Sequence, residues 1–300
     1  MMDLRRGLDN QMDAKKKRKM TMTICQSVRR LLSVMICCVS FFILTMLSSC
    51  AEVPVTHRHG LHLVPNSELN AMSLQEYDKV LKESKLSTDQ GKIQMVRGVG
   101  DRIARAAEAF LEDTGQGHKV RGYQWEFNLI EDDKTANAWC MPGGKVAVYT
   151  GILPYTKDET GLAVVMGHEV AHALADHGNE RMSHGLLANL GGMALSVALA
   201  QKPQQTRELF MTVFGVTANV GVLLPYSRLH ESEADRIGLL IMARAGYDPR
   251  EAIPFWERMN KDDKSRPPEL LSTHPAPASR VANINVYLPE AMQYYERVQK

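Results

Sequence analysis

The chain has 300 residues, of which 44% are hydrophobic and 23% charged, as in globular proteins that bury a core. Nine basic and three acidic residues lie within residues 1–30, so residues 31–300 carry a net charge of −4 although the whole chain carries +2. The body of the protein is therefore mildly acidic. This excludes an extended basic surface for nucleic acid, and we expect no nucleic-acid partner.

The N-terminal segment has the pattern of an export signal. An apolar run from Leu31 to Leu47 follows Arg29 and Arg30 and leads into Leu47-Ser48-Ser49-Cys50. The run is short for a membrane-spanning helix, and an uncleaved anchor is the alternative. Leu-Ser-Ser-Cys resembles the bacterial lipobox. That resemblance implies loss of residues 1–49, a lipid on Cys50, and a place on the periplasmic side of a bacterial envelope, with Ala51 favouring the outer membrane.

The rest of the chain divides into a tether and one domain. Residues 50–72 are polar and contain prolines, which predicts a lipid-anchored tether, and residues 73–300 form the predicted catalytic domain. Three of the five cysteines precede Cys50, so Cys140 is the other cysteine of the mature chain. It cannot take part in an internal disulfide framework, and we expect a partly buried strand thiol.

The predicted elements give a mainly helical α+β fold with a small β-sheet. One helix is expected to begin at Ser73, with Glu76 completing a capping box, and another to span residues 89–113. Alternation at residues 125–129 and the run 145–150 predict strands, and the pattern is helical from about residue 158. The two apolar stretches in 186–224 are expected to form helices over or near the active site; an integral membrane protease with this region in the bilayer is an alternative.

The strongest chemical motif is His168-Glu169-Val170-Ala171-His172, an H-E-x-x-H on a predicted helix. Residues four apart lie about 40° apart around a helix, so both imidazoles can reach one Zn²⁺ from the same face. Glu169 is suited to act as general base on a water molecule. The motif predicts one zinc ion per chain.

A catalytic zinc needs a third protein ligand. The metzincin pattern would place Gly at 175 and His at 178, but Ala175 and Gly178 stand there. His177 is out of phase with the motif, and we expect it, like His184, on the surface.

A carboxylate from a second helix is the better candidate. Glu231 and Asp235 are four residues apart and share a face, whereas Glu233 is rotated away. We predict that Glu231 completes the ligand set and that Asp235 accepts a hydrogen bond from the distal N–H of a ligand histidine.

Three motifs together resemble the HtpX- and BepA-like gluzincins, the metalloendopeptidase family that includes the CAAX prenyl proteases and the Oma-type protease. They are the zinc motif at 168–172, the run from His230 to Gly238, and Thr273-His274-Pro275. The resemblance covers about residues 90–288 and implies a zincin-like fold with the sheet beside the active-site helix. The lipoprotein and periplasmic quality-control members are the most similar because of the lipobox and the single catalytic domain.

The resemblance also implies roles for further residues. His274 would lie near the metal, where in some relatives it keeps the enzyme latent; a helix-capping role is the alternative. Arg280 would stabilise the oxyanion or form a salt bridge. Asn137, Ala138 and Trp139 would form an edge strand that binds extended substrate.

These inferences predict a zinc metalloendopeptidase, a hydrolase that cleaves unfolded or misassembled cell-envelope proteins. The alternative is an envelope chaperone or assembly factor that uses the same cleft for binding.

Overall fold

The structure is a computed structural model that describes residues 50–190, 203–213, 228–261, 268–274 and 279–300, together with Ser33 and Met35. The predicted signal, apart from those two residues, lies outside this part, as does most of the apolar region 186–224. Signal cleavage and the lipid on Cys50 therefore stay predictions. Among the described helices, none is both long enough and apolar enough to cross a membrane.

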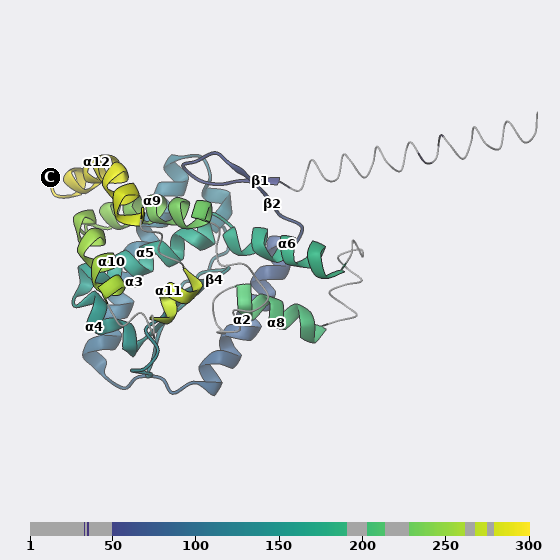
Figure 1. Ribbon diagram of the computed structural model, residues 1–300, viewed down its shortest axis with the longest axis horizontal. Coiled ribbons are helices and arrows are strands. Elements are labelled where there is room, and N and C mark those ends of the chain that lie inside the picture. The colour runs from purple at the N-terminus through teal and green to yellow at the C-terminus, as the bar shows by residue number, and fades with distance from the viewer. Residues whose placement is uncertain are drawn as a thin grey trace, which may run out of the picture. The chain divides into compact units, whose positions relative to one another are not determined.

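The domain is mainly helical, as the sequence predicts, and it contains two small sheets where the sequence predicts one (Figure 1). The strands are β1 (Cys50–Glu52), β2 (His59–Leu61), β3 (Glu126–Ile130), β4 (Ala138–Met141) and β5 (Lys145–Tyr149). The α-helices are α2 (Asn66–Glu83), α3 (Gln90–Asp113), α4 (Leu153–Thr156), α5 (Glu159–Leu174), α6 (His177–Leu190), α8 (Pro203–Val213), α9 (Arg228–Arg244), α10 (Ala252–Lys261), α11 (Glu269–Thr273) and α12 (Arg280–Val298).

The start of the domain differs from expectation. Helix α2 begins at Asn66 after Pro65 rather than at Ser73, and the predicted capping box is wrong because Ser73 lies inside the helix, where its hydroxyl donates to the carbonyl of Pro142 (2.6 Å). The preceding segment packs on the domain instead of standing away from it as a tether. Val53 is fully buried there, and Arg58 forms ion pairs with two carboxylates.

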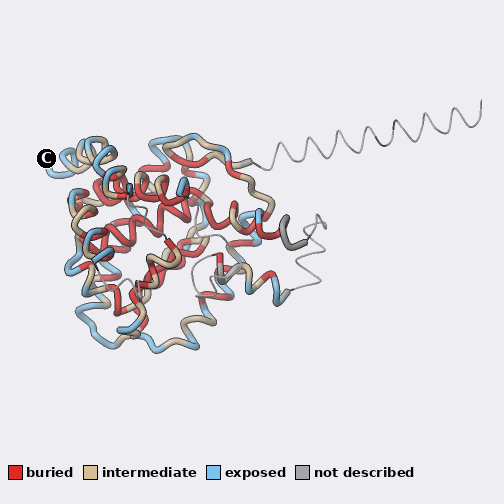
Figure 2. Tube along the Cα trace, in the orientation of Figure 1, coloured by how far each residue is buried: buried red, intermediate tan, exposed pale blue. Residues whose placement is uncertain are grey.

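The three-stranded sheet separates two apolar cores. Its order is β3-β5-β4, with β3 parallel and β4 antiparallel to β5, so β4 lies at the edge. Because side chains alternate along a strand, Ala138 and Cys140 of β4 face the core with α5, whereas Trp139 faces the core with α2. Figure 2 shows the buried elements in the interior of the domain.

Helix α5 lies at the centre of the larger core. Asp158 caps it by accepting hydrogen bonds from the N–H groups of Thr160 and Gly161, and the helix is buried on all sides from Gly161 to Leu174. It packs against α3, α9 and β4. The active-site motif is therefore held by a rigid, fully surrounded helix.

The close approach of α5 and α9 depends on a pair of glycines. A Cβ built on Gly238 would stand 3.0 Å from the backbone of Gly167 and from the nitrogen of His168. No side chain therefore separates the two helices beside His168. This brings the N-terminal half of α9 within reach of the zinc motif.

We expect Gly238→Ala to lower the free energy of unfolding by about 1–3 kcal/mol, because an added methyl must force two backbones apart. Chemical denaturation of the variant measures this. Gly98→Ala is the matched control, since a methyl added to that exposed glycine of α3 would meet no atom within 4 Å, and it should stabilise by about 0.5–1 kcal/mol. Equal effects of the two substitutions would contradict the close-packing explanation.

Candidate metal centre

The two histidines of the zinc motif converge as predicted. His168 and His172 lie one turn apart on α5, and their Nε2 atoms are 3.1 Å apart. Both side chains are buried, as is that of Glu169 between them in sequence. The four-residue spacing therefore places both imidazoles on one face of the helix, as predicted.

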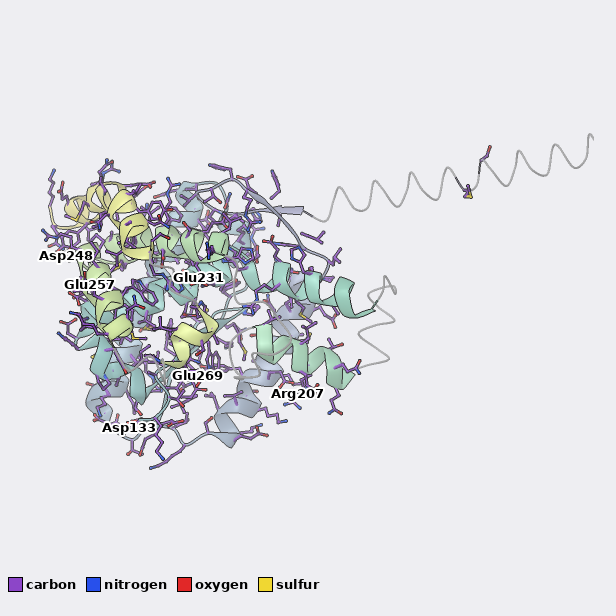
Figure 3. The ribbon with its side chains drawn as sticks, viewed as in Figure 1. Asp133, Arg207, Glu231, Asp248, Glu257 and Glu269 are labelled. Atoms are coloured by element: carbon purple, nitrogen blue, oxygen red, sulfur yellow. The ribbon has the colours of Figure 1, made fainter. Side chains whose placement is uncertain are left out.

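Glu231 of α9 reaches the same point. Its two carboxylate oxygens each lie 3.5 Å from one imidazole, Oε2 from Nε2 of His168 and Oε1 from Nε2 of His172. His274, which caps the end of α11, places Nδ1 3.1 Å from Oε1 of Glu231. Figure 3 shows Glu231 among the side chains in the middle of the domain.

These distances fit a zinc ion. One donor atom from each of His168, His172, Glu231 and His274 can be chosen so that all four lie within 4.8 Å of one another. Donors about 2.0–2.2 Å from a tetrahedral ion stand about 3.3–3.6 Å apart. The two histidine nitrogens are 3.1 Å apart here, and each lies 3.5 Å from one carboxylate oxygen of Glu231. The nitrogen and oxygen donors are also of the kind that zinc prefers.

Asp235 and Arg280 contact the zinc donors His168 and Glu231. Asp235 Oδ1 lies 3.0 Å from the distal Nδ1 of His168, beside the atom that the sequence predicts it to bond, and the hydrogen bond itself stays a prediction. Arg280 donates from Nε to Asp235 (2.8 Å) and from Nη2 to Glu231 (2.5 Å), and its guanidinium lies over the ring of Trp256. The salt-bridge alternative for Arg280 is thus what the structure contains. Its Nη1 has no hydrogen-bond partner in the described part of the chain, and the oxyanion role stays a prediction.

The environments of Glu169 and of the two histidines shift their pKa values in ways that bear on their roles. Burial raises the pKa of Glu169, and its Oε1 has no hydrogen-bond partner among the described residues, so an acceptor is left available. Burial holds the pKa of His172 well below its usual value, which favours the neutral imidazole that a metal needs. Burial also lowers the pKa of His168, but Asp235 and Glu231 outweigh it and raise the pKa to about 9, so a metal ion must displace a proton there.

In the strand predicted to bind substrate, the side chains are buried and only the main chain could contact a peptide. Asn137, Ala138 and Trp139 are all buried. Trp139 packs edge-on against Tyr77, on the sheet face turned away from α5. Cys140 is a strand thiol as predicted, but it is buried rather than partly buried. Any specificity contact at this strand would therefore come from its backbone edge.

The prediction that His177 lies on the surface is wrong, whereas His184 is exposed as expected. Helix α5 ends at Leu174, and Asp176 adopts a left-handed conformation with φ of 56°. The turn brings His177 back against the motif at the start of α6, with its Nδ1 2.9 Å from Nδ1 of His172. Helical phase cannot place His177, because the helix that carries the motif is interrupted at Asp176 before that residue.

The buried ion pairs around Arg58 predict an acid-sensitive stability. Burial raises the pKa of Glu233, but His177, Arg58 and Thr56 outweigh it and lower the pKa to about 2. Burial also raises the pKa of Glu180, but His230 and Arg58 outweigh it and lower that pKa. Both carboxylates thus stabilise the fold above the unfolded-state pKa of about 4.3, and this contribution is lost as the pH falls from there towards 2.

We therefore expect the free energy of unfolding to fall between pH 5 and pH 3 by about 1 kcal/mol more in the wild type than in Arg58→Met. Urea titrations at each pH measure this difference. Parallel pH profiles of the two proteins would contradict it.

A helix that carries H-E-x-x-H against a second helix that supplies a glutamate defines the class of gluzincin-type zinc metallopeptidases. The sequence profile of peptidase family M48 matches residues 99–287, and the chain belongs to that family.

Several characterised proteins are similar to this chain. It is 36% identical over 202 residues to the mitochondrial metalloendopeptidase OMA1 of Saccharomyces cerevisiae, covering 63% of this chain and 54% of that protein. It is 30% identical over 250 residues to human OMA1, covering 81% and 47%. The beta-barrel assembly-enhancing protease of Escherichia coli K12 is 32% identical over 165 residues, covering 53% and 33%. The chain thus spans about half the length of the OMA1 proteins it matches.

The relatives overturn the expected location. The lipobox resemblance predicts a place on the periplasmic side of a bacterial envelope. The OMA1 relatives from two yeasts, Arabidopsis thaliana and human are mitochondrial proteins, so the lipobox resemblance was an insufficient basis for that prediction.

Proposed function

We propose that the protein is a zinc-dependent metalloendopeptidase in which His168, His172 and Glu231 hold the metal. The observation that carries the proposal is the convergence of these three donors from α5 and α9, beside a buried glutamate with a free acceptor oxygen. When bound, zinc would supply a Lewis acid that polarises the scissile carbonyl and acidifies the attacking water.

The chain's own groups divide the remaining work. Glu169 is placed to accept the proton of the attacking water and return it to the leaving amine. Burial raises the pKa of Glu169, which favours a carboxylate that both accepts and returns a proton. Asp235 orients His168, and Arg280 fixes the carboxylates of Glu231 and Asp235.

The proposed substrates are unfolded or misassembled polypeptides bound in extended form. Strand β4 is at the edge of its sheet and packs against α5, so an added peptide strand would run beside the zinc motif. Recognition through main-chain hydrogen bonds accepts many sequences, which suits a protease that removes damaged proteins.

We further propose that the structure represents a latent form. His274 stands among the metal donors, and its Nε2 lies 3.6 Å from Oε1 of Glu169. Helix α11 is held against the segment just before β4 by a hydrogen bond from the Leu270 N–H to the Ala136 carbonyl (3.1 Å). Four protein donors would leave no open position for water, whereas catalytic zinc sites keep one. Release of α11 would open both the metal and the edge strand.

Zinc analysis and casein cleavage by the full-length chain in detergent test the proposed activity. We expect one zinc per chain, loss of cleavage with 1,10-phenanthroline, and recovery on adding zinc. Cleavage that is insensitive to chelation, or a chain that binds no zinc, would refute it.

A further inference from the structure

A hydrogen-bonded chain leads away from the metal donors to the N-terminal segment. The Nδ1 of His172, on the far side of the ring from its metal-facing Nε2, lies 2.9 Å from Nδ1 of His177. The Nε2 of His177 lies 3.0 Å from Oε2 of Glu233. Both His177 and Glu233 are almost completely buried, at 0% and 2% exposure, so solvent does not compete for these contacts.

The Glu233 carboxylate is fixed by donors that precede the catalytic domain. Thr56 donates its hydroxyl to Oε1 (2.7 Å), and Arg58 donates from Nε to Oε1 (3.0 Å) and from Nη2 to Oε2 (3.0 Å). The same guanidinium forms a fork with Glu180 of α6 at 2.9 and 2.8 Å. Thr56 and Arg58 lie outside residues 99–287, which match the family, yet they complete a network inside it.

The direction of these hydrogen bonds decides which nitrogen of His172 carries the hydrogen. An ionised Glu233 only accepts, so Nε2 of His177 carries the hydrogen. The Nδ1 of a neutral His177 is then an acceptor, and Nδ1 of His172 must donate to it. This leaves the lone pair of His172 on Nε2, the atom that faces His168 and Glu231.

We infer that Thr56, Arg58, Glu233 and His177 are positioning residues that set the tautomer and orientation of His172 for metal binding. The N-terminal segment is thereby part of the support of the metal centre. The inference rests on the proposed function only in taking His172 as a zinc ligand. On the opposite side, Asp235 Oδ1 lies 3.0 Å from Nδ1 of His168, so a carboxylate of α9 stands behind each histidine, in one case through an intervening imidazole.

The test compares two glutamates that share Arg58 as a partner. Glu233→Gln replaces the obligate acceptor by an amide that can also donate to His177, which would reverse the tautomer of His172. Glu180→Gln is the matched control, because Glu180 pairs with Arg58 and His230 and not with His177 in the described network. The full-length chain is used, and zinc affinity is measured by chelator competition alongside the visible spectrum of the Co²⁺-substituted protein.

We expect Glu233→Gln to weaken zinc binding by about 10- to 100-fold and to change the Co²⁺ spectrum. Glu180→Gln should leave the zinc affinity within about twofold of the wild type and the Co²⁺ spectrum unchanged, even if its melting temperature falls as far as that of Glu233→Gln. A purely structural network would lower both melting temperatures without separating the two zinc affinities, and that result would overturn the inference.

Two conservative substitutions of Thr56 test the inference even if the glutamate variants misfold. Thr56→Val keeps the shape of the side chain and removes only its donor, whereas Thr56→Ser keeps the donor. We expect a loss of zinc affinity of about threefold or more with valine, and wild-type affinity with serine. Equal affinities in the two variants would count against the inference.

These readouts also separate the inference from the proposed function. A wild-type chain that binds one zinc through His172 but cleaves no protein would refute the peptidase and leave the comparison of zinc affinities intact. A zinc affinity that is unaffected by His172→Ala would overturn the inference itself.

Discussion

Glu169→Gln is expected to abolish protein cleavage while zinc stays bound. The substitution keeps the size of the side chain but removes the group that accepts the proton, and loss of a general base costs about 10²- to 10⁴-fold in rate. Glu169 is buried next to the donors, and its Oε1 has no hydrogen-bond partner among the described residues, so this oxygen is available to accept a proton from water. Casein cleavage and zinc content, measured on the same preparation, give both readouts.

Glu257→Gln, on the exposed face of α10, is the matched control and should cleave like the wild type. Glu169→Gln also decides between hydrolysis and binding as the cellular role. If cells that carry Glu169→Gln kept every function of the wild type although cleavage was lost, the chaperone alternative would be correct and the peptidase proposal would be wrong.

His274→Ala is expected to raise cleavage activity. His274 is one of four buried donors around the candidate metal position, and its removal would free a position for water and substrate. If the closed arrangement is favoured by about 1.4 kcal/mol, its loss increases turnover about tenfold. Initial rates on casein at saturating zinc measure the change.

His184→Ala is the control, because His184 is an exposed histidine of α6 outside the donor set. A fall in kcat with unchanged zinc content in His274→Ala would show instead that His274 assists the reaction. That outcome would show that the proposal of a latent state is wrong.

The zinc donors could be predicted because their geometry is local or periodic. His168 and His172 share a face of one helix, and Glu231 and Asp235 share a face of another, so spacing alone aligns each pair. The glycines at 167 and 238 that let the two helices meet were not recognised, since their role appears only when both backbones are seen in contact.

The supports of the site could not be predicted in the same way. The prediction for His177 is wrong because the helix breaks at Asp176, where the sequence has no glycine or proline that would mark the break. Thr56 and Arg58 contact Glu233 across more than 170 residues, and a short polar segment with two prolines carries no periodicity that would indicate such a contact. The sequence does contain one signal: helical phase predicts that Glu233 faces away from the metal, and a buried carboxylate there needs a partner.

Anomalous diffraction at the zinc edge from crystals of the full-length protein tests the central claim most directly. The account predicts a single peak about 2.0–2.2 Å from Nε2 of His168, Nε2 of His172 and a carboxylate oxygen of Glu231. A zinc peak elsewhere, or one at the histidines with Glu231 out of coordinating reach and no substitute donor, would contradict it.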